Sequence, residues 1–129
     1  MKLKLKHHFD AAHRLDGYSG KCSNLHGHRW EVEVSIEGDI DEKTGMLMDF
    51  TQIKKIIDEL DHKALLRDCA ENTNLINVLN EMKIEIKVFN FKPTAENIAI
   101  YLKTQIKEIL INSIVEVSVW ESLEAQVVA

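Results

Sequence analysis

Residues that form disulfides or interrupt helices and strands are scarce in this sequence, which has two cysteines, one proline and five glycines among 129 residues. With only Cys22 and Cys69 available, a disulfide framework is not expected, and the reducing cytoplasm is the expected compartment. Internal repeats, low-complexity tracts and linker-like stretches are also missing. The composition therefore predicts a single domain over residues 1–129.

The sequence also lacks an excess of positive charge and any long apolar run. The formal net charge is −5 and no basic stripe stands out, which argues against a nucleic-acid partner. No apolar run approaches the length of about 18 residues that a membrane helix needs. Residues 2–6 alternate lysine with leucine, which indicates a strand and not a signal peptide.

Two long strands are predicted near the start of the chain. The first covers Lys2 to His13, and a turn-rich connection follows over residues 16–20. The second covers His26 to Glu37, where apolar and polar side chains alternate with a two-residue period. Such a period is typical of a strand with one buried and one exposed face.

Two longer helices are expected further along. The first follows Asp49, a good N-cap, and ends near Asp61 and His62. The second begins at Pro93 or Thr94, with its buried stripe on Ile98, Leu102, Ile106, Ile109 and Leu110.

Residues 63–92 are the least readable part of the sequence. A short helix over residues 74–82 and a short strand over residues 84–88 are the signals there. Two more strands are expected over residues 115–119 and 125–129. This order predicts an α+β domain with an antiparallel sheet and helices on one face.

Three histidines form the strongest chemical signal. His26 and His28 are two residues apart, so on a strand both imidazoles leave the same face. With His13 from the neighbouring strand they predict a three-histidine metal site with one open position, the arrangement of catalytic zinc. Zinc is favoured because neutral imidazoles suit it, although copper or nickel could take the same ligands in vitro.

Other candidate site residues are less specific. Cys22 follows Lys21 in a loop that ends beside the histidines, which favours a reactive thiolate or a fourth zinc ligand over an ordinary buried cysteine. Asp61 and His62 are either a proton-transfer pair or an ordinary helix C-terminus. Glu121, at a strand end, could accept two parallel N–H bonds from a planar heterocycle. The alternative for Glu121, and for Glu96 in the first turn of its helix, is a solvated carboxylate.

Five segments of the chain resemble, in order, those of the 6-pyruvoyl- and 6-carboxy-tetrahydropterin synthases. The similarity spans Phe9 to Glu121, and its most specific part is Cys-x-x-x-His-Gly-His with an Ala-Ala-His upstream. The matching segments are Phe9–Leu15, Cys22–His28, Leu60–His62, Pro93–Asn97 and Trp120–Glu121.

This resemblance implies a role for each site residue. His13, His26 and His28 would be the zinc ligands, and Cys22 the thiolate that removes a proton from the substrate side chain. Asp61 and His62 would form a proton relay, and Glu121 would hold the pterin ring and join that relay. Thr94 and Glu96 match positions near the pterin.

The resemblance also implies a fold and an assembly. The fold would be the tunnelling fold, a four-stranded antiparallel sheet with two long helices on one face. Subunits would join as homotrimers or hexamers with active sites between them, which would also cover the sheet edges.

Within the family, the three-residue gap between Cys22 and His26 is similar to that of the 6-carboxy branch. The implied lyase reaction converts 7,8-dihydroneopterin triphosphate to 6-carboxy-5,6,7,8-tetrahydropterin, acetaldehyde and triphosphate, a step toward queuosine-type 7-deazaguanines. The alternatives are the pyruvoyl-forming reaction, a non-catalytic pterin- or purine-binding module, and a zinc hydrolase. The chain departs from the family at Leu66, where asparagine is common, and in a long insert over residues 67–91.

Overall fold

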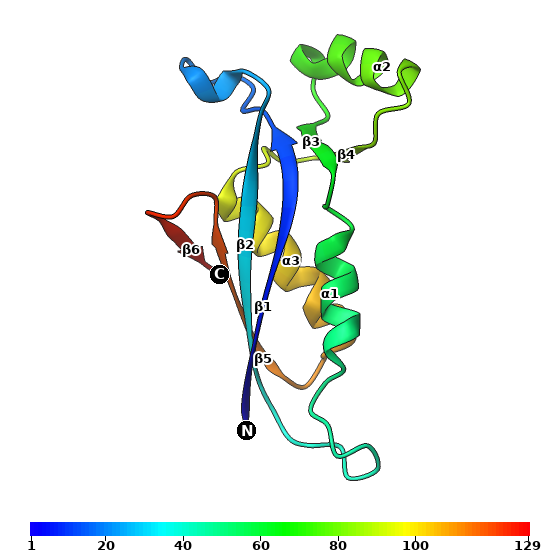
Figure 1. Cartoon of the computed structure of the whole chain (residues 1–129), viewed down its shortest axis with the longest axis vertical. Coiled ribbons are helices and arrows are strands. Elements are labelled where there is room, and N and C mark those ends of the chain that lie inside the picture. The colour runs from blue at the N-terminus through cyan, green and yellow to red at the C-terminus, as the bar shows by residue number, and fades with distance from the viewer.

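The computed structural model describes all residues 1–129, and Figure 1 shows a long curved sheet with helices packed beside it. Two short 3-10 turns, η1 (Lys21–Ser23) and η2 (Ala70–Asn72), accompany the main elements. The strands and helices are β1 (Lys2–His13), β2 (His26–Glu37), α1 (Phe50–Asp58), β3 (Lys63–Arg67), α2 (Thr73–Glu81), β4 (Ile86–Phe89), α3 (Ala95–Ile109), β5 (Ile114–Trp120) and β6 (Gln126–Val128).

The sheet has six strands in the order β4-β3-β1-β2-β5-β6. Strands β1, β2, β5 and β6 pair antiparallel, whereas β3 pairs parallel with both β1 and β4. The α+β class is confirmed, but the expected four-stranded antiparallel sheet is wrong in detail because it lacks β3 and β4. The segment Lys63–Arg67 shows no alternation because Ala64, Leu65 and Leu66 are all buried, as is usual for a strand covered on both faces.

One face of the sheet, here called the inner face, packs against α1 and α3 (Figure 1). Alternation along β1 and β2 directs Phe9 and Trp30 to this face, where both are fully buried with their rings stacked 5.7 Å apart. Ile53 and Ile57 of α1 and five residues of α3 complete this core. The two helices on one face are thus as expected.

The opposite face, here called the outer face, carries α2. Leu66 points away from the inner core and is buried against Leu79 of α2, with Ala12 of β1 beside them. The apolar residue at 66 therefore gives the helix of the 67–91 insert a place to dock. None of the three helices has both the length and the apolar character needed to span a membrane.

Both long helices begin where the sequence indicates. The side chain of Asp49 accepts a hydrogen bond from Thr51 N, 2.8 Å away, at the start of α1, and that of Thr94 accepts one from Asn97 N, 3.3 Å away, at the start of α3. Helix α1 ends at Asp58, earlier than expected. The chain then turns through His62, which has a left-handed φ of 57°, into β3.

We expect Leu66→Ala to destabilise the fold by about 2–5 kcal/mol, because it leaves a cavity between β3 and α2. Ile111→Ala is the control, since Ile111 is 82% exposed and its loss should change stability by less than about 0.5 kcal/mol. Urea unfolding measures both variants. Equal stabilities would show that α2 is not held through Leu66.

Candidate metal centre and active site

Four side chains, three from β1 and β2 and one just after β5, meet at one end of the inner face. The register pairs His13 at the end of β1 with His26 at the start of β2, and pairs Ala11 with His28. Glu121 follows directly after β5, which lies on the other side of β2. Ligand atoms of His13, His26, His28 and Glu121 all lie within 4.8 Å of one another, so the group could hold a metal ion.

The distances within this group match the spacing around one small cation. His13 Nε2 is 3.0 Å from His26 Nε2 and 3.4 Å from Glu121 Oε1, and His28 Nε2 is 3.0 Å from the same oxygen. Zinc–nitrogen bonds of 2.0–2.1 Å in a tetrahedron place neighbouring ligands about 3.3 Å apart. These three separations are compatible with one tetrahedral ion, and all the ligand atoms lie within 4.8 Å of one another.

Backbone carbonyls fix which nitrogens face the centre. His13 Nδ1 lies 2.7 Å from the carbonyl of Pro93, and His26 Nδ1 lies 2.7 Å from that of Asn24. A carbonyl only accepts, so each Nδ1 carries the proton and donates it. In the neutral rings both Nε2 lone pairs then face each other at 3.0 Å, an arrangement that a cation between them stabilises.

The Nε2 atom of His28 is also placed where a cation would stabilise it. This nitrogen is buried and makes no hydrogen bond, although Glu121 Oε1 lies 3.0 Å away. Buried polar atoms are nearly always paired in proteins. An unpaired nitrogen that faces a carboxylate and two other imidazoles is therefore what a ligand-ready metal site contains.

Protonation in the group also suits a metal. Burial lowers the pKa of His28, more than the charge of Glu121 raises it. A hydrogen bond from His13, when that ring is protonated, lowers the pKa of the Glu121 carboxyl against the opposing effect of burial. A neutral imidazole and an ionised carboxylate are the forms that bind metal ions.

Trp30 supports the group from the core. Its indole meets His13 edge-on at 4.9 Å between centroids and His28 at 5.7 Å, and its Nε1 donates to Ala11 O at 3.3 Å. His13 is fully buried. The histidines of β1 and β2 are thus positioned by strands and by packing against a buried indole.

A cavity of about 330 Å³ adjoins the group. His28, Glu121 and Glu96 line it together with Ala95, so Glu96 and two members of the metal group border the same cavity. Thr94 does not line this cavity, and its hydroxyl caps α3. A planar ligand in the cavity would meet two carboxylates.

Asp61 and His62 form a pair at the edge of β1, apart from the metal group. Asp61 Oδ1 accepts from the backbone N–H of Asp10 at 2.8 Å, and Oδ2 lies 2.7 Å from His62 Nδ1. The His62 side chain is 76% exposed and borders an open cavity of about 560 Å³ with Arg29. No hydrogen bond or ion pair joins it to the four-residue group.

Cys22 lies in η1, in the loop that connects β1 to β2. Its carbonyl accepts from Leu15 N at 2.8 Å, which closes the loop at the same end of the sheet as His26. Its thiol does not belong to the group of atoms within 4.8 Å of one another. The thiol is free, and the structure gives it no place among the ligands.

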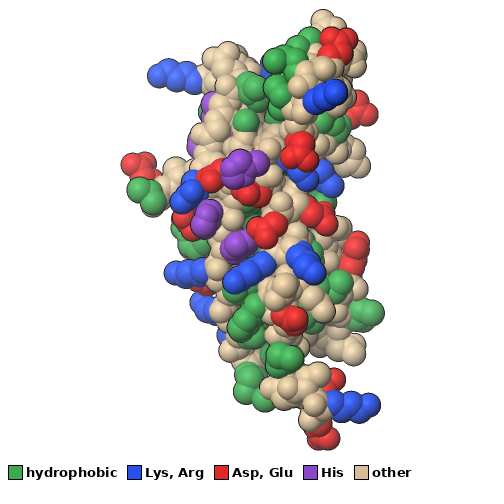
Figure 2. Space-filling model, turned by 45° about the vertical axis from the view of Figure 1, so that its right-hand side comes forward, with side chains coloured by type: hydrophobic (Ala, Val, Ile, Leu, Met, Phe, Trp, Pro, Cys, Tyr) green, Lys and Arg blue, Asp and Glu red, His purple; other side chains and the backbone are tan.

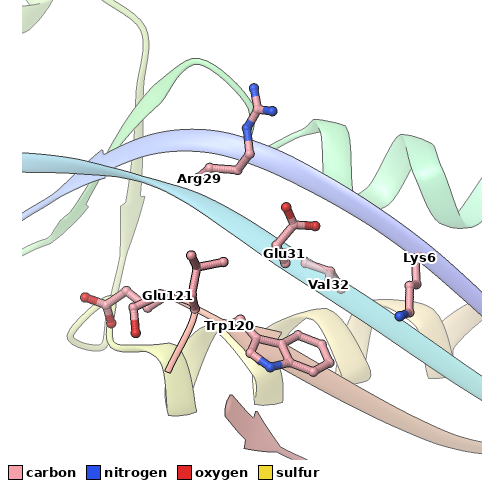
Figure 3. Close-up of a pocket in the computed structure, with 8 residues that line it drawn as sticks. Lys6, Arg29, Glu31, Val32, Trp120 and Glu121 are labelled. Carbon is pink, nitrogen blue, oxygen red and sulfur yellow. The ribbon is translucent and has the colours of Figure 1, made fainter. Parts of the chain in front are cut away.

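A third pocket, of about 470 Å³, lies on the outer face (Figure 3). Figure 3 shows the indole of Trp120 at its side, Arg29 and Glu31 projecting from β2, and Glu121 at the end away from Lys6. Glu121 thus borders space on both sides of its strand. Figure 2 shows histidine side chains interleaved with acidic and basic ones at the surface.

Sequence reasoning missed two contributors, the carbonyls of Pro93 and Asn24 that orient His13 and His26. Backbone acceptors leave no residue-type signature, so no pattern could have found them. Sequence reasoning also did not place Glu121 beside the histidines, since pairing of β2 with β5 brings it there.

The sequence matches the model of the family described as "6-pyruvoyl tetrahydropterin synthase" over residues 2–129. A 6-carboxy-5,6,7,8-tetrahydropterin synthase of Haemophilus influenzae is 35% identical over 131 residues, covering 94% of this chain and 92% of that protein. One of Rickettsia felis is 42% identical over 104 residues, covering 76% and 74%.

Solved structures agree with the fold. An uncharacterised protein of Wolinella succinogenes superposes with a TM-score of 0.82 at 20% identity, covering 100% of this chain and 97% of that one. The 6-pyruvoyl tetrahydropterin synthase of Caenorhabditis elegans gives 0.67 at 24% identity, covering 100% and 94%. The six-stranded sheet is therefore of the tunnelling type.

The pair Asp61–His62 yields a pH prediction. The bond to Asp61 raises the pKa of His62 above its ordinary value, which is about 6.5. The pair therefore stabilises the fold below about pH 6.5, and this stabilisation is lost as the pH rises through the raised pKa.

Asp61→Asn should return the pKa of His62 toward its ordinary value, as measured by NMR titration of the imidazole. Glu59→Gln removes a nearby carboxylate that does not contact the ring, so it should leave the titration unchanged. An unaltered His62 titration in Asp61→Asn would contradict the assigned pair.

Proposed function

Because the chain belongs to the 6-pyruvoyl tetrahydropterin synthase family, we propose that it acts on 7,8-dihydroneopterin triphosphate. The product would be 6-carboxy-5,6,7,8-tetrahydropterin, formed with release of acetaldehyde and triphosphate. Two relatives that cover most of the chain are named for this product. The three-residue gap between Cys22 and His26 supports the same branch. The product would feed 7-deazaguanine synthesis of the queuosine type.

One observation carries the proposal. Three imidazoles and a carboxylate converge on one point, and a cavity lined by Glu121 and Glu96 adjoins that point. A ring in this cavity would place its side chain beside His28. The arrangement can therefore hold a planar heterocycle and its reactive side chain at the same time.

The metal proposed for His13, His26 and His28 is zinc, as their neutral imidazoles favour. When bound, zinc would supply positive charge that makes a neighbouring C–H bond of the substrate more acidic. Glu121 would accept N–H bonds from the pterin ring and orient it. Glu96, across the cavity, would stand against another edge of the ring.

Cys22 would act as the base that takes the side-chain proton. It lies in the loop that leads directly into the strand of His26 and His28. The thiolate is the reactive form of cysteine, and a nearby cation stabilises it. We assign Cys22 to proton transfer and not to metal binding, because its sulfur is outside the four-residue group.

Asp61 and His62 would return a proton in a site of another copy of the chain. Within one chain the pair is tied to Asp10 and has no contact with the metal group. The exposed ring of His62 beside an open cavity suits a contact with a second subunit. A homotrimer or hexamer would supply that contact and cover the edge strands β4 and β6.

A second candidate function is the pyruvoyl-forming reaction on the same substrate, which the family description itself favours. It breaks no carbon–carbon bond, so acetaldehyde release separates the two reactions. A non-catalytic pterin-binding module would bind the ring and yield no product. A zinc hydrolase would keep its activity without Cys22.

The proposed location is the cytoplasm. Cys22 and Cys69 are both free thiols in the structure. A reducing compartment keeps such thiols free.

The proposal is tested by mass spectrometry of products from the zinc-loaded protein and dihydroneopterin triphosphate. We expect 6-carboxy-tetrahydropterin and acetaldehyde. Cys22→Ala should lower turnover by about 10²–10⁴-fold while zinc content stays the same. Equal loss of zinc in this variant would instead make Cys22 a ligand, and a pyruvoyl product would identify the other branch.

Mixing variants tests whether Asp61 and His62 act across subunits. Cys22→Ala and His62→Ala should each be nearly inactive. Coexpressed at equal levels, they should restore up to about a quarter of the sites if subunits combine at random in a closed oligomer. Native mass spectrometry verifies the mixing. Mixed oligomers without recovered activity would place the pair in the site of its own chain.

A further inference from the structure

Glu121 lies where a metal ligand would be, and it also lines the cavity proposed for the ring. Its Oε1 lies 3.0 Å from His28 Nε2 and 3.4 Å from His13 Nε2. These separations match the spacing of about 3.3 Å between ligands on one tetrahedral ion. The same carboxylate lines the cavity of about 330 Å³ with Glu96.

We propose that Glu121 is the fourth metal ligand in the substrate-free protein and leaves the metal to bind the pterin ring. The ring itself would then open the coordination position that its side chain uses. This inference rests on the proposed function, because it takes the pterin as the planar ligand of Glu121.

The two roles compete for one oxygen of Glu121. A carboxylate that accepts two parallel N–H bonds from a planar group uses both oxygens, on the side away from its own methylene group. Oε1 now lies 3.4 Å from His13 Nε2 and 3.0 Å from His28 Nε2. A ring paired with both oxygens would draw Oε1 toward itself, so Glu121 would turn from the metal to hold the ring.

Glu121 is the member of the group that can turn. It follows the last residue of β5 and precedes a stretch without regular structure. Its side chain is 32% exposed, whereas His13 is fully buried. Space lies on both sides of it, in the cavity beside Glu96 and in the outer pocket beside Trp120 (Figure 3).

Such an exchange would contribute to specificity. A ligand without the paired N–H groups could not draw the carboxylate from the metal. The fourth position would stay closed to it, and the three imidazoles would remain shielded. Recognition of the ring and exposure of the metal would thus be one event.

Metal affinity without substrate gives the first test. We expect Glu121→Gln to weaken zinc binding by at least about tenfold, as perturbed ligand sets do, in competition with a chromophoric chelator. The visible spectrum of the cobalt(II) protein should change as well, because the ligand set changes. Glu124→Gln is the control, as it removes a carboxylate from the same turn outside the metal group.

The second test uses 6-methylpterin, which has the ring but no side-chain hydroxyls. At saturating 6-methylpterin the wild-type protein should bind zinc less tightly, and zinc should weaken ring binding by the same factor. The expected coupling is about 5–150-fold. Unchanged zinc affinity in Glu121→Gln, or in the wild type with the ring bound, would overturn the exchange.

His28→Ala separates this inference from the function on which it rests. If His28→Ala loses zinc while Glu121→Gln retains full affinity, only the exchange is wrong. If His28→Ala keeps zinc at full stoichiometry and affinity, the three-histidine site and the proposed function fail together. Far-UV circular dichroism shows that each variant is folded.

Discussion

Two backbone carbonyls, those of Asn24 and Pro93, determine the chemistry of the whole site. Each accepts a hydrogen bond from an Nδ1–H group, so the Nε2 of that ring carries no proton and faces the common point. Two lone pairs at 3.0 Å repel unless something positive lies between them. The strand pairing, the indole of Trp30 packed against His13 and His28, and the carboxylate of Glu121 are arranged around that requirement. The group is therefore specified by its protonation as much as by its distances.

The sheet keeps the metal group, helix α2 and the Asp61–His62 pair in three different places. The inner face carries the metal group and is covered by α1 and α3, whereas α2 docks on the outer face through Leu66. Asp61 and His62 lie at the edge of β1, held by both backbone groups of Asp10. No hydrogen bond or ion pair joins this pair to the metal group of its own chain. In the proposed function a second copy of the chain would therefore supply the acid–base pair.

The two-residue alternation of β1 and β2 was enough to predict that His13, His26 and His28 share a face. The cap at Asp49 and the α+β class were equally readable, and the start of α3 was located to Pro93 or Thr94. Strand β3 was not, because Ala64, Leu65 and Leu66 are all buried and show no period. Proximity of Glu121 to His28 depends on a long-range pairing of strands. No local pattern encodes such a pairing, and the roles of Cys22, Asp61 and His62 still depend on the family resemblance.

The imidazole of His13 joins two parts of the molecule that are distant in sequence. One nitrogen is held by the residue just before the cap of α3, and the other faces the centre from the tip of the first hairpin. An ion bound there would stabilise the contact between α3 and the β1–β2 hairpin. Chelators would therefore lower the stability of the fold as well as the activity. The melting temperature of the protein would then depend on how much metal was available during growth and purification.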